Sequence, residues 1–244
     1  MQKIVNAIIV FAVIVTLVSI SACNGCNSKR GNGHVIIKDR PVTSFSKISI
    51  EGIFPVELSQ DGGPEFVKVE ADENLQEFML VRNDGDELVV ETEDNVSIRK
   101  SKKLKVFINL KNISELNYKS VGSLTTQGKL KLDSLEINSE SVGKVDVDID
   151  AKFLRANLNS VGVTNLQGNV TEARINNKSV GTLNAYGLKT QTIMLHNTAV
   201  GNAEIYADSA FFIRSSAIGN VYYKGNGEVK ELNTEGLGKV QRGE

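Results

Sequence analysis

The tetrapeptide SVGS (residues 120–123) returns as SVGK (141–144), SVGV (160–163) and SVGT (179–182). AVGN (199–202), AIGN (217–220) and GLGK (236–239) follow at similar intervals. The glycines of the seven phrases are Gly122, Gly143, Gly162, Gly181, Gly201, Gly219 and Gly238. A fixed period near 20 residues is typical of a solenoid, in which each repeat packs only against its neighbours.

The residues around each glycine alternate between aliphatic and polar. Aliphatic side chains mostly stand two and four positions after the glycine, with polar ones between them, as in the run Val145 to Asp150. This period of two predicts strands with one buried face, and helical spacing is not sustained in the region. The aliphatic residue before each glycine is expected in the interior as well: Val121, Val142, Val161, Val180, Val200, Ile218 and Leu237.

Short strands and corners in a coil of about 20 residues predict an all-β fold, a parallel β-helix. Each glycine is expected at a corner, where a positive φ favours a residue without a Cβ atom. A column of asparagines is expected to stack as an amide ladder near the corners, with His196 in the same column. Its members are Asn117, Asn138, Asn159 and Asn176.

Residues 34–115 have a different pattern. Strand-like runs are separated by turn signals such as DGGP (61–64) and NDGD (83–86), and residues 72–81 could hold one short helical turn. All three prolines lie here, which suits a region outside the continuous ladders. We expect an N-terminal antiparallel β cap over residues 34–115 and the β-helical repeats over 116–244.

The N-terminus has the pattern of a targeting signal. A basic start precedes the apolar run 4–20, which ends at Ser21-Ala22-Cys23. This is typical of a lipoprotein signal peptide over residues 1–22, with Cys23 as the lipid attachment site and 23–33 as a flexible tether. An uncleaved membrane anchor is the alternative. The second cysteine, Cys26, then has no partner, so neither a disulfide framework nor a cysteine zinc site is expected.

Composition and motifs limit the possible functions. The chain has 28 basic and 29 acidic residues, so a nucleic-acid partner is not expected. No nucleophile elbow or phosphate-binding loop is present, and the two histidines are His34 and His196. We therefore predict no enzyme activity, no catalytic residues, no metal site and no cofactor.

Two charged runs have alternative interpretations. Asp146, Asp148 and Asp150 share one face of a strand and could bind Ca²⁺ or hydrolyse a polysaccharide, but a solvated outer face is the simpler interpretation. The basic run 99–105 could touch anionic lipid or glycan, or it could be an edge strand protected from aggregation.

Three tyrosines are the candidate ligand-binding residues. Tyr186 and Tyr206 both stand five positions after their corner glycine, so they are expected on adjacent coils, facing outward, with Tyr222 beside them. Such a ledge could stack sugars, and the alternative is an aromatic pair that only stabilises the outer face.

The stretches GIFPVELSQDG (52–62) and ENLQEFMLVRNDGDELVV (73–90), followed by the S-V-G coils, resemble the DUF2807 group, the autotransporter-adhesin head or GIN domain. The resemblance covers residues 35–244. It implies an all-β fold with right-handed β-helical coils in envelope lipoproteins, and it carries over no catalytic residues. The family often has Ser-Gly-Ser-Gly corners where this chain has Ser-Val-Gly.

The resulting hypothesis is a non-enzymatic lipoprotein of the cell envelope, anchored by its lipid, with the outer membrane as the expected site and either face open. It would act as an adhesin or as a module that binds carbohydrate or an envelope protein. A polysaccharide-processing enzyme is an alternative that rests on fold analogy. A structural scaffold, with homo-oligomers formed through the last coil, is another.

Overall fold

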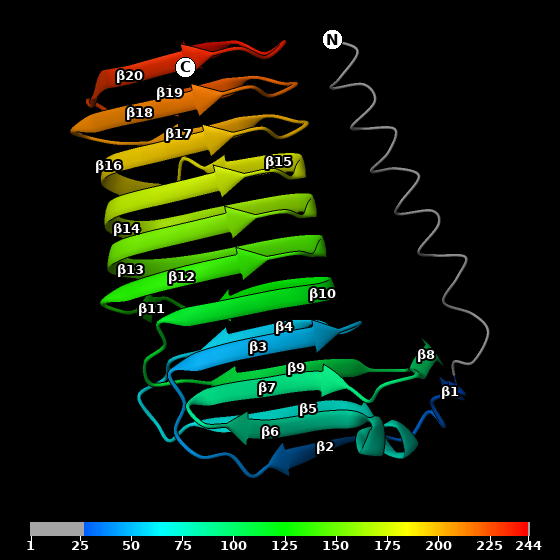
Figure 1. Ribbon diagram of the computed structural model, residues 1–244. Coiled ribbons are helices and arrows are strands. Elements are labelled where there is room, and N and C mark those ends of the chain that lie inside the picture. The colour runs from blue at the N-terminus through cyan, green and yellow to red at the C-terminus, as the bar shows by residue number, and fades with distance from the viewer. Residues whose placement is uncertain (1–26, 244) are drawn as a thin grey trace.

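The structure is a computed structural model that describes residues 27–243. Coils stack in one direction on a cap formed by the earlier part of the chain (Figure 1). About seven turns form this β-solenoid, which confirms the predicted fold class. The expected signal peptide (1–22), Cys23 and Cys26 lie outside the described residues. In residues 27–243 no helix has the length and apolar character needed to cross a membrane.

Residues 27–109 contain nine strands and one 3-10 helix. These elements are β1 (Asn27–Arg30), β2 (Val35–Arg40), β3 (Lys47–Gly52), β4 (Val56–Ser59), β5 (Phe66–Asp72), η1 (Glu73–Phe78), β6 (Met79–Asp84), β7 (Glu87–Thr92), β8 (Val96–Lys100) and β9 (Leu104–Asn109). The helix η1 lies where the sequence predicted a short helical turn.

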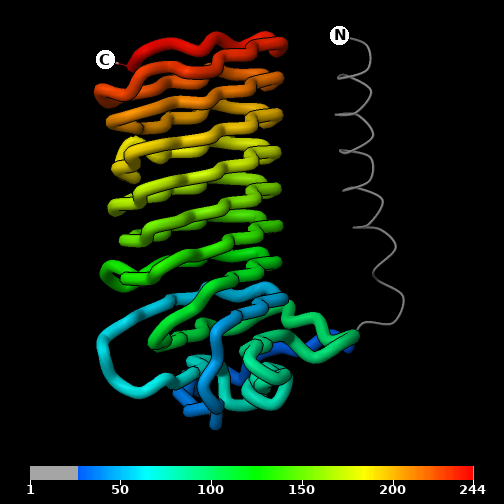
Figure 2. Tube along the Cα trace, turned by 60° about the vertical axis from the view of Figure 1, so that its left-hand side comes forward, coloured from blue at the N-terminus to red at the C-terminus, as the bar shows by residue number. Residues whose placement is uncertain are grey.

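The repeats supply the remaining strands. They are β10 (Glu115–Gln127), β11 (Leu130–Lys131), β12 (Ser134–Ser139), β13 (Val142–Leu158), β14 (Val161–Asn177), β15 (Val180–Ala185), β16 (Leu188–Asn197), β17 (Ala203–Tyr206), β18 (Ala210–Ser215), β19 (Val221–Lys224), β20 (Glu228–Thr234) and β21 (Val240–Arg242). Their pairings with one another are all parallel. Long strands such as β13 and β14 run through a bend, so one strand serves two sides of the coil (Figure 2).

Each corner glycine divides its coil into two sides. We call the strand segments before the glycines the upstream sheet and those after them the downstream sheet. In the upstream sheet Ser134–Ser139 pairs with Phe153–Leu158, and that segment pairs with Glu172–Asn177. In the downstream sheet Val145–Asp150 pairs with Thr164–Asn169.

The corner glycines confirm the predicted reason for the repeat. Gly143 and Gly162 have φ angles of 139° and 135°, which side chains other than hydrogen rarely allow. They are also register partners. A Cβ atom on Gly162 would lie closer than 3.0 Å to the carbonyl oxygen of Gly143. Each corner is therefore closed by the corner of the previous coil, and both backbone angle and space require glycine.

The valines beside these glycines face outward, so the prediction that they fill the interior was wrong. Val121 and Val142 are 50% exposed, and Val161 and Val180 are 42% exposed. The alternation continues through the corner without a break. Counting back from buried Val145 in steps of two leads to Ser141, so Val142 must point away from the core.

Serines take the inner side of the corner instead. Ser120, Ser141, Ser160 and Ser179 are buried. The hydroxyl oxygens of Ser141 and Ser160 lie 3.0 Å apart, and the backbone N–H of Ser160 donates to the hydroxyl of Ser179 over 3.2 Å. Small hydroxyl groups fit the narrow corner and satisfy one another there, which larger aliphatic side chains could not do.

The predicted asparagine ladder exists, but one of its members differs from the prediction and the ladder does not lie at a corner. Asn138 donates to the side-chain oxygen of Asn117 over 2.9 Å, and Asn157 donates to Asn138 over 2.7 Å. Asn157 therefore takes the place expected for Asn159, and Asn176 pairs with it in register. The ladder runs along the outer face of the upstream sheet rather than at a corner, because residues of equal parity share a strand face.

The cap is a mixed sheet rather than a purely antiparallel one. The pairs β2–β5, β5–β9 and β6–β7 are antiparallel, as expected. However, β3 and β4 both pair with β10 in parallel. On their other edges, β3 pairs in parallel with β7, and β4 pairs in parallel with β9. The coil geometry thus begins at Lys47, well before residue 116, and the antiparallel strands cover only its lowest edge.

The end of the expected tether is ordered by contacts with distant residues. Residues 27–30 form β1, which pairs with β8. The backbone N–H groups of Gly33 and Lys102 donate to the Asp72 carboxylate over 2.5 and 2.7 Å. Local composition could not indicate this strand, because its partners lie about seventy residues away.

Candidate functional site

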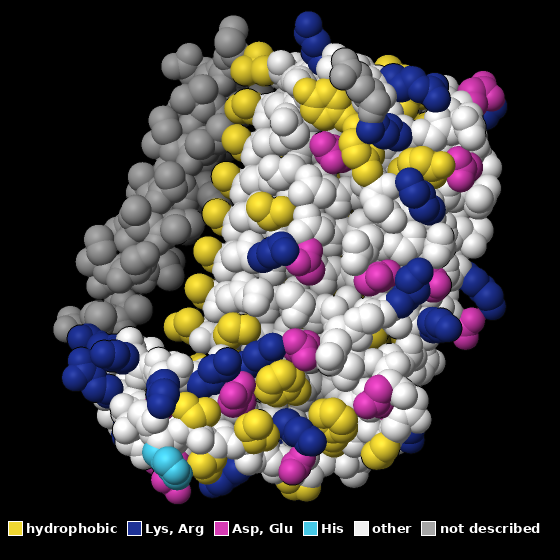
Figure 3. Space-filling view, turned by 180° about the vertical axis from the view of Figure 1, so that it is seen from behind, with side chains coloured by type: hydrophobic (Ala, Val, Ile, Leu, Met, Phe, Trp, Pro, Cys, Tyr) yellow, Lys and Arg dark blue, Asp and Glu magenta, His cyan; other side chains and the backbone are white. Residues whose placement is uncertain are grey.

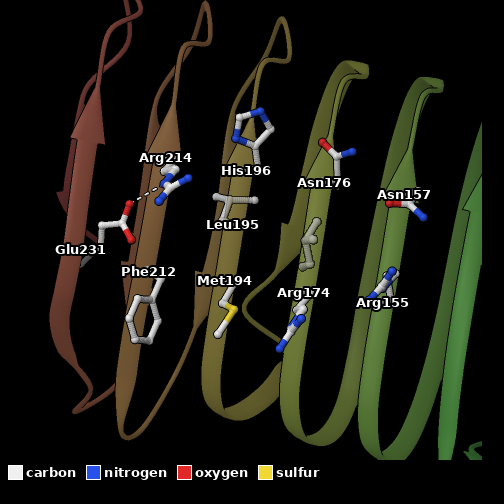
Figure 4. Close-up of a pocket in the computed structure, with 11 residues that line it drawn as sticks. Arg155, Asn157, Arg174, Asn176, Met194, Leu195, His196, Phe212, Arg214 and Glu231 are labelled. Carbon is white, nitrogen blue, oxygen red and sulfur yellow. Dashed lines mark hydrogen bonds and ion pairs between the residues drawn. The ribbon is translucent and has the colours of Figure 1, made fainter.

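The outer face of the upstream sheet is the strongest candidate for a binding site. Two columns of side chains project from successive coils and border a shallow trough of about 540 Å³ (Figure 4). One column contains Arg155, Arg174, Met194 and Phe212, and the other contains Asn157, Asn176, His196 and Arg214. The trough therefore combines positive charge, amide groups and apolar surface.

Arg155 and Arg174 supply the positive charge at one end. They are register partners on β13 and β14. Arg174 bonds to Glu172 over 2.9 Å, and its guanidinium carbon lies 5.2 Å from the centre of the Phe153 ring. In the described residues Arg155 forms no ion pair, although its other register partner is Glu136. Like charges on adjacent strands reduce stability, so this pair favours an anion.

Arg214 lies at the other end of the trough and is already paired. Its guanidinium group binds Glu231 on β20 (Figure 4). The hydrogen bond and the negative charge of Glu231 raise the pKa of Arg214, so this side chain stays charged. The Arg155 end is consequently the more open of the two for an added carboxylate.

Asn176 offers an unused hydrogen-bond acceptor between the two ends. Its side-chain oxygen is buried and has no hydrogen-bond partner among the residues that the structure describes. The ladder below it is closed, because Asn157 donates to Asn138. A buried acceptor without a partner costs stability, and a ligand hydroxyl donating to Asn176 would relieve this cost.

The apolar part of the trough comes from Met194 and Phe212. Both are partly exposed and lie on the outer face of β16 and β18 (Figure 4). His196 stands above Met194 in the asparagine column, as the sequence predicted. Apolar side chains flanked by arginine and amide groups suit a ligand with both ring faces and polar edges, such as an acidic sugar.

The three predicted tyrosines lie on the other side of the coils, in and beside the downstream sheet. Tyr206 is the register partner of Lys224, and Tyr222 is the partner of Glu204. Burial, Glu204 and Tyr222 raise the pKa of Tyr186, so Tyr186 and Tyr222 are near one another. All three side chains are partly buried. The structure thus brings the three tyrosines together on one side of the coils, as the sequence predicted.

Lysines cover two of the tyrosine rings. The ammonium nitrogen of Lys189 lies 3.6 Å from the centre of the Tyr206 ring, and that of Lys224 lies 4.6 Å from the Tyr186 ring. The hydroxyl of Tyr206 also donates to Asp208 over 2.8 Å. A sugar would have to displace a lysine to stack on either ring.

The three aspartates of the downstream sheet are bonded to their neighbours, although one carboxylate oxygen of Asp148 has no hydrogen-bond partner among the described residues. Asp146 binds Lys144 and accepts a hydrogen bond from Asn165, and Asp150 lies 3.0 Å from Lys129. Burial raises the pKa of Asp150, but hydrogen bonds from Asn169 and Lys129 lower it further, and the net pKa is below its usual value. Within residues 27–243 no group of three His, Cys, Asp or Glu side chains could hold a metal ion.

Sequence reasoning missed Arg155 and Arg174, although a signal was present. Each stands two residues before an asparagine of the ladder, so the same face had to carry both columns. The corresponding residues of the two lower coils are Glu115 and Glu136, and this change of charge hid the column.

These features define the class of the protein as a capped parallel β-solenoid, one sheet face of which carries side chains suited to binding a ligand. The chain belongs to the DUF2807 family, described as "Putative auto-transporter adhesin, head GIN domain", whose sequence profile matches residues 44–227. The resemblance found in the sequence is thereby confirmed. No curated protein sequence matches the chain.

Solved structures with the same fold come from species of Bacteroides and Parabacteroides. A "putative adhesin" of Bacteroides fragilis has a TM-score of 0.82 and 23% identity, over 88% of this chain and 99% of that one. A "putative adhesin" of Parabacteroides merdae has a TM-score of 0.63 and 21% identity, over 89% and 99%. A "putative lipid binding protein" of Parabacteroides distasonis has a TM-score of 0.67 and 18% identity, over 88% and 99%. At these identities the likeness shows the fold.

Proposed function

We propose that the protein is a non-enzymatic, adhesin-like component of the bacterial cell envelope that binds an acidic glycan on its upstream sheet. The observation that carries the proposal is the pairing of Arg155 with Arg174 beside the free Asn176 oxygen. The family description supports an adhesin-like role. The name of the Bacteroides fragilis neighbour agrees with that role.

The trough fits a glycan that carries carboxylates. Guanidinium groups bind carboxylates through two parallel hydrogen bonds, which gives both strength and orientation. The Asn176 oxygen would accept a sugar hydroxyl, and Met194 and Phe212 would contact a ring face. Because successive coils lie at the spacing of adjacent strands, about 4.8 Å, an extended chain can contact the arginines on two coils and the apolar side chains on the next two.

The lipid anchor belongs to the same proposal. The apolar run before Cys23 supports export and acylation at that residue, which would hold the protein on an envelope membrane. The outer membrane is the proposed location. Mass spectrometry of the mature chain tests this part: a chain that begins at an acylated Cys23 supports it, and a chain that retains residues 1–22 contradicts it.

Calorimetric titration with polygalacturonate, with neutral dextran as the reference, tests glycan binding. We expect binding to the acidic polymer and a loss of about ten- to a hundredfold in affinity in Arg155→Ala, since a charge-assisted hydrogen bond contributes about 1.5–3 kcal/mol. Lys152→Ala is the matched control, because Lys152 is exposed on the same strand but outside the trough. Equal affinity of Arg155→Ala and the parent chain would contradict the proposal.

The tyrosines remain a second candidate surface for a ligand. Tyr186, Tyr206 and Tyr222 lie together, and lysines cover two of the rings. Retained binding in Arg155→Ala, together with a loss in Tyr186→Ala, would move the binding site to the downstream sheet.

A further inference from the structure

The outward aliphatic residues form a continuous line along one edge of the solenoid, which we call the aliphatic ridge. Its most exposed members are Leu237 at 74% and Ile53 at 61%. The full set is Ile53, Val121, Val142, Val161, Val180, Val200, Ile218 and Leu237. Figure 3 shows the ridge as a column of hydrophobic side chains that rises along one edge of the molecule.

The ridge is held in register by the backbone. Val121 pairs with Val142, Val142 with Val161, and the bridges continue through Val180 and Val200 to Ile218. The columns on either side are mixed and mostly polar, with residues such as Lys119, Glu140, Ser123 and Lys144. Soluble proteins rarely leave a contiguous apolar line of this length exposed, so the ridge indicates a contact surface.

Positive charge gathers at the foot of the ridge. We call Lys29, Arg30, Arg99, Lys100 and Lys102 the basic cluster; they lie on β1, on β8 and in the loop after β8. Within residues 27–243 no ion pair is formed by these five side chains, whereas neighbouring Lys103 lies 3.9 Å from Glu70. Lys and Arg side chains crowd the same corner in Figure 3.

The basic cluster reduces the stability of its own strand pair. Arg30 and Lys100 are direct register partners, and like charges in such positions repel one another. The whole chain has a net charge of only -1, so the cluster is a local excess rather than a general property. Its position next to the ridge suggests that an anionic partner offsets the repulsion.

The ridge and the cluster meet at one corner of the cap. A hollow there is lined by Ile53 at the foot of the ridge and by Val96 and Ile98 on β8, the strand that also carries Arg99 and Lys100. Its remaining walls include the carboxylates of Glu51, Glu91, Glu93 and Asp94, so the apolar residues and the neighbouring basic cluster, rather than the whole hollow, form the candidate lipid contact. The described chain begins at Asn27 in β1, which pairs with Val96. Cys23 lies four residues ahead of Asn27, so a lipid on Cys23 would bring this corner to a membrane surface.

A bilayer fits this surface better than two other occupants. A second copy would present the same basic cluster, and a stable dimer buries about 800 Å² on each partner, which a line one side chain wide does not supply. Residues 4–20 of the chain are almost wholly apolar, but residues 1–26 contain no acidic side chain to meet the cluster. Anionic lipids offer acyl chains to the ridge and phosphates to the cluster.

We propose that the solenoid leans onto an anionic bilayer, with the aliphatic ridge in the membrane interface and the basic cluster on the lipid headgroups. This second membrane contact goes beyond the proposed glycan binding and rests on the proposed anchor only for its orientation. In this orientation the outer face of the upstream sheet is not covered by the bilayer, so a polymer can reach Arg155 and Arg174.

Site-directed spin labelling of the full lipidated chain tests the contact. Val161→Cys, in a Cys26→Ser background, places a nitroxide on the ridge, and Thr171→Cys places the control label on an exposed position of the same strand, β14. With vesicles of phosphatidylglycerol and phosphatidylcholine, we expect the label at 161 to become accessible to lipid-soluble oxygen and to lose accessibility to a water-soluble nickel chelate. The label at 171 should not change.

The charge dependence is the second part of the test. The change in accessibility of the label at 161 should be lost with pure phosphatidylcholine vesicles and in the triple variant Arg30→Gln/Arg99→Gln/Lys100→Gln. It should also be lost at 1 M salt, where the screening length falls to about 3 Å. A label at 161 that stays equally water-exposed with and without anionic vesicles overturns the proposal.

Two other outcomes also overturn it and name the true occupant. Protection at 161 without vesicles that increases with protein concentration indicates a second copy. Protection that is independent of concentration, in a chain whose mass retains residues 1–22, indicates the chain's own apolar segment. The mass and the glycan titration are separate measurements, so failure of the anchor or of glycan binding is distinguishable from failure of the ridge contact.

Discussion

At the scale of single residues, Asp72 connects the start of the described chain to the cap. Its carboxylate is fully buried and accepts hydrogen bonds from the backbone N–H groups of Gly33 and Lys102. Burial raises the pKa of Asp72, but the backbone hydrogen bonds from Lys102, Gly33 and Lys103 together lower it further, so the net pKa lies below its usual value. The ionised form is therefore the stabilising one.

We expect Asp72→Asn to lower the free energy of unfolding by about 1–3 kcal/mol at neutral pH, because buried charged acceptors are lost. The pKa is lower in the folded state, so this contribution is present above the unfolded pKa of about 3.9 and disappears as the pH falls below it. Urea unfolding at neutral and acid pH measures both effects. A difference between variant and parent that does not shrink in acid would contradict the role of the charge.

Val161 and Leu166 provide a matched pair for the inside–outside register. Leu166→Asp should destabilise the protein by about 3–5 kcal/mol, because it places an unpaired charge among buried aliphatic side chains. Val161→Asp should change stability by less than about 1 kcal/mol in solution, because Val161 is 42% exposed. Urea denaturation decides the matter, and similar losses in both variants would show that the ridge is buried.

The residue scale also shows what could be predicted from sequence. The position and spacing of the corner glycines followed directly from the repeat, because only glycine fits both the angle and the space. The side occupied by Val142 was predicted wrongly because hydrophobicity was used in place of strand parity. Strand parity instead makes Ser141 the buried member of the pair.

At the scale of elements, the hydrogen-bonded amide ladder joins three coils of the upstream sheet. Asn138 is its central member, since it donates to Asn117 and accepts from Asn157. The ladder was predictable because its members repeat at the coil period. Asn159 was predicted in place of Asn157 because the two asparagines are two residues apart, and strand alternation therefore assigns both to the same face.

We expect Asn138→Ala to lower the free energy of unfolding by about 1–2 kcal/mol, since two side-chain hydrogen bonds are lost on a partly exposed face. Asn159→Ala is the control, because Asn159 is exposed and outside the ladder. The double variant Asn138→Ala/Asn157→Ala should lose less than the sum of the single variants, because the two share a bond. Strict additivity in urea unfolding would show that the ladder does not act as a unit.

The arginine site and the order of β1 lay beyond sequence reasoning for different reasons. The arginines share a column with Glu115 and Glu136, so their alignment was visible only as a change of charge. The partner of β1 is β8, whose position depends on the folded cap. Local patterns do not specify pairings between segments so far apart in the chain.

At the scale of the whole molecule, the two ends of the solenoid differ. The first coil is covered by the cap strands, whereas β20 and β21 pair only with the coil below them in the described residues. Solenoids unfold through nearest-neighbour contacts, so an end with one neighbour opens more readily. Hydrogen exchange should be fastest in β20 and β21 and slowest in β13 and β14. Uniform protection along the coils would contradict this order.

The last coil also bears on self-association. The exposed edge of β20 carries Glu228, Lys230 and Glu231, and the register shifts between Phe211 and Phe212 where it pairs with β18. Charges and bulges on an edge strand oppose pairing with another copy. We therefore expect a monomer in sedimentation at increasing concentration, and a dimer that Lys230→Ala strengthens would indicate pairing through this edge.

Because each corner glycine stacks on the corner glycine of the previous coil, the length of the solenoid can change only by whole coils. Insertion of a single residue within a coil would turn the following side chains to the opposite face, so serines, arginines and valines would all lose their columns. Duplication of one complete repeat would lengthen every column by one member and leave each face chemically unchanged. A gene of this kind can therefore adjust the reach of its product by counting repeats, without redesigning the surfaces that the product carries.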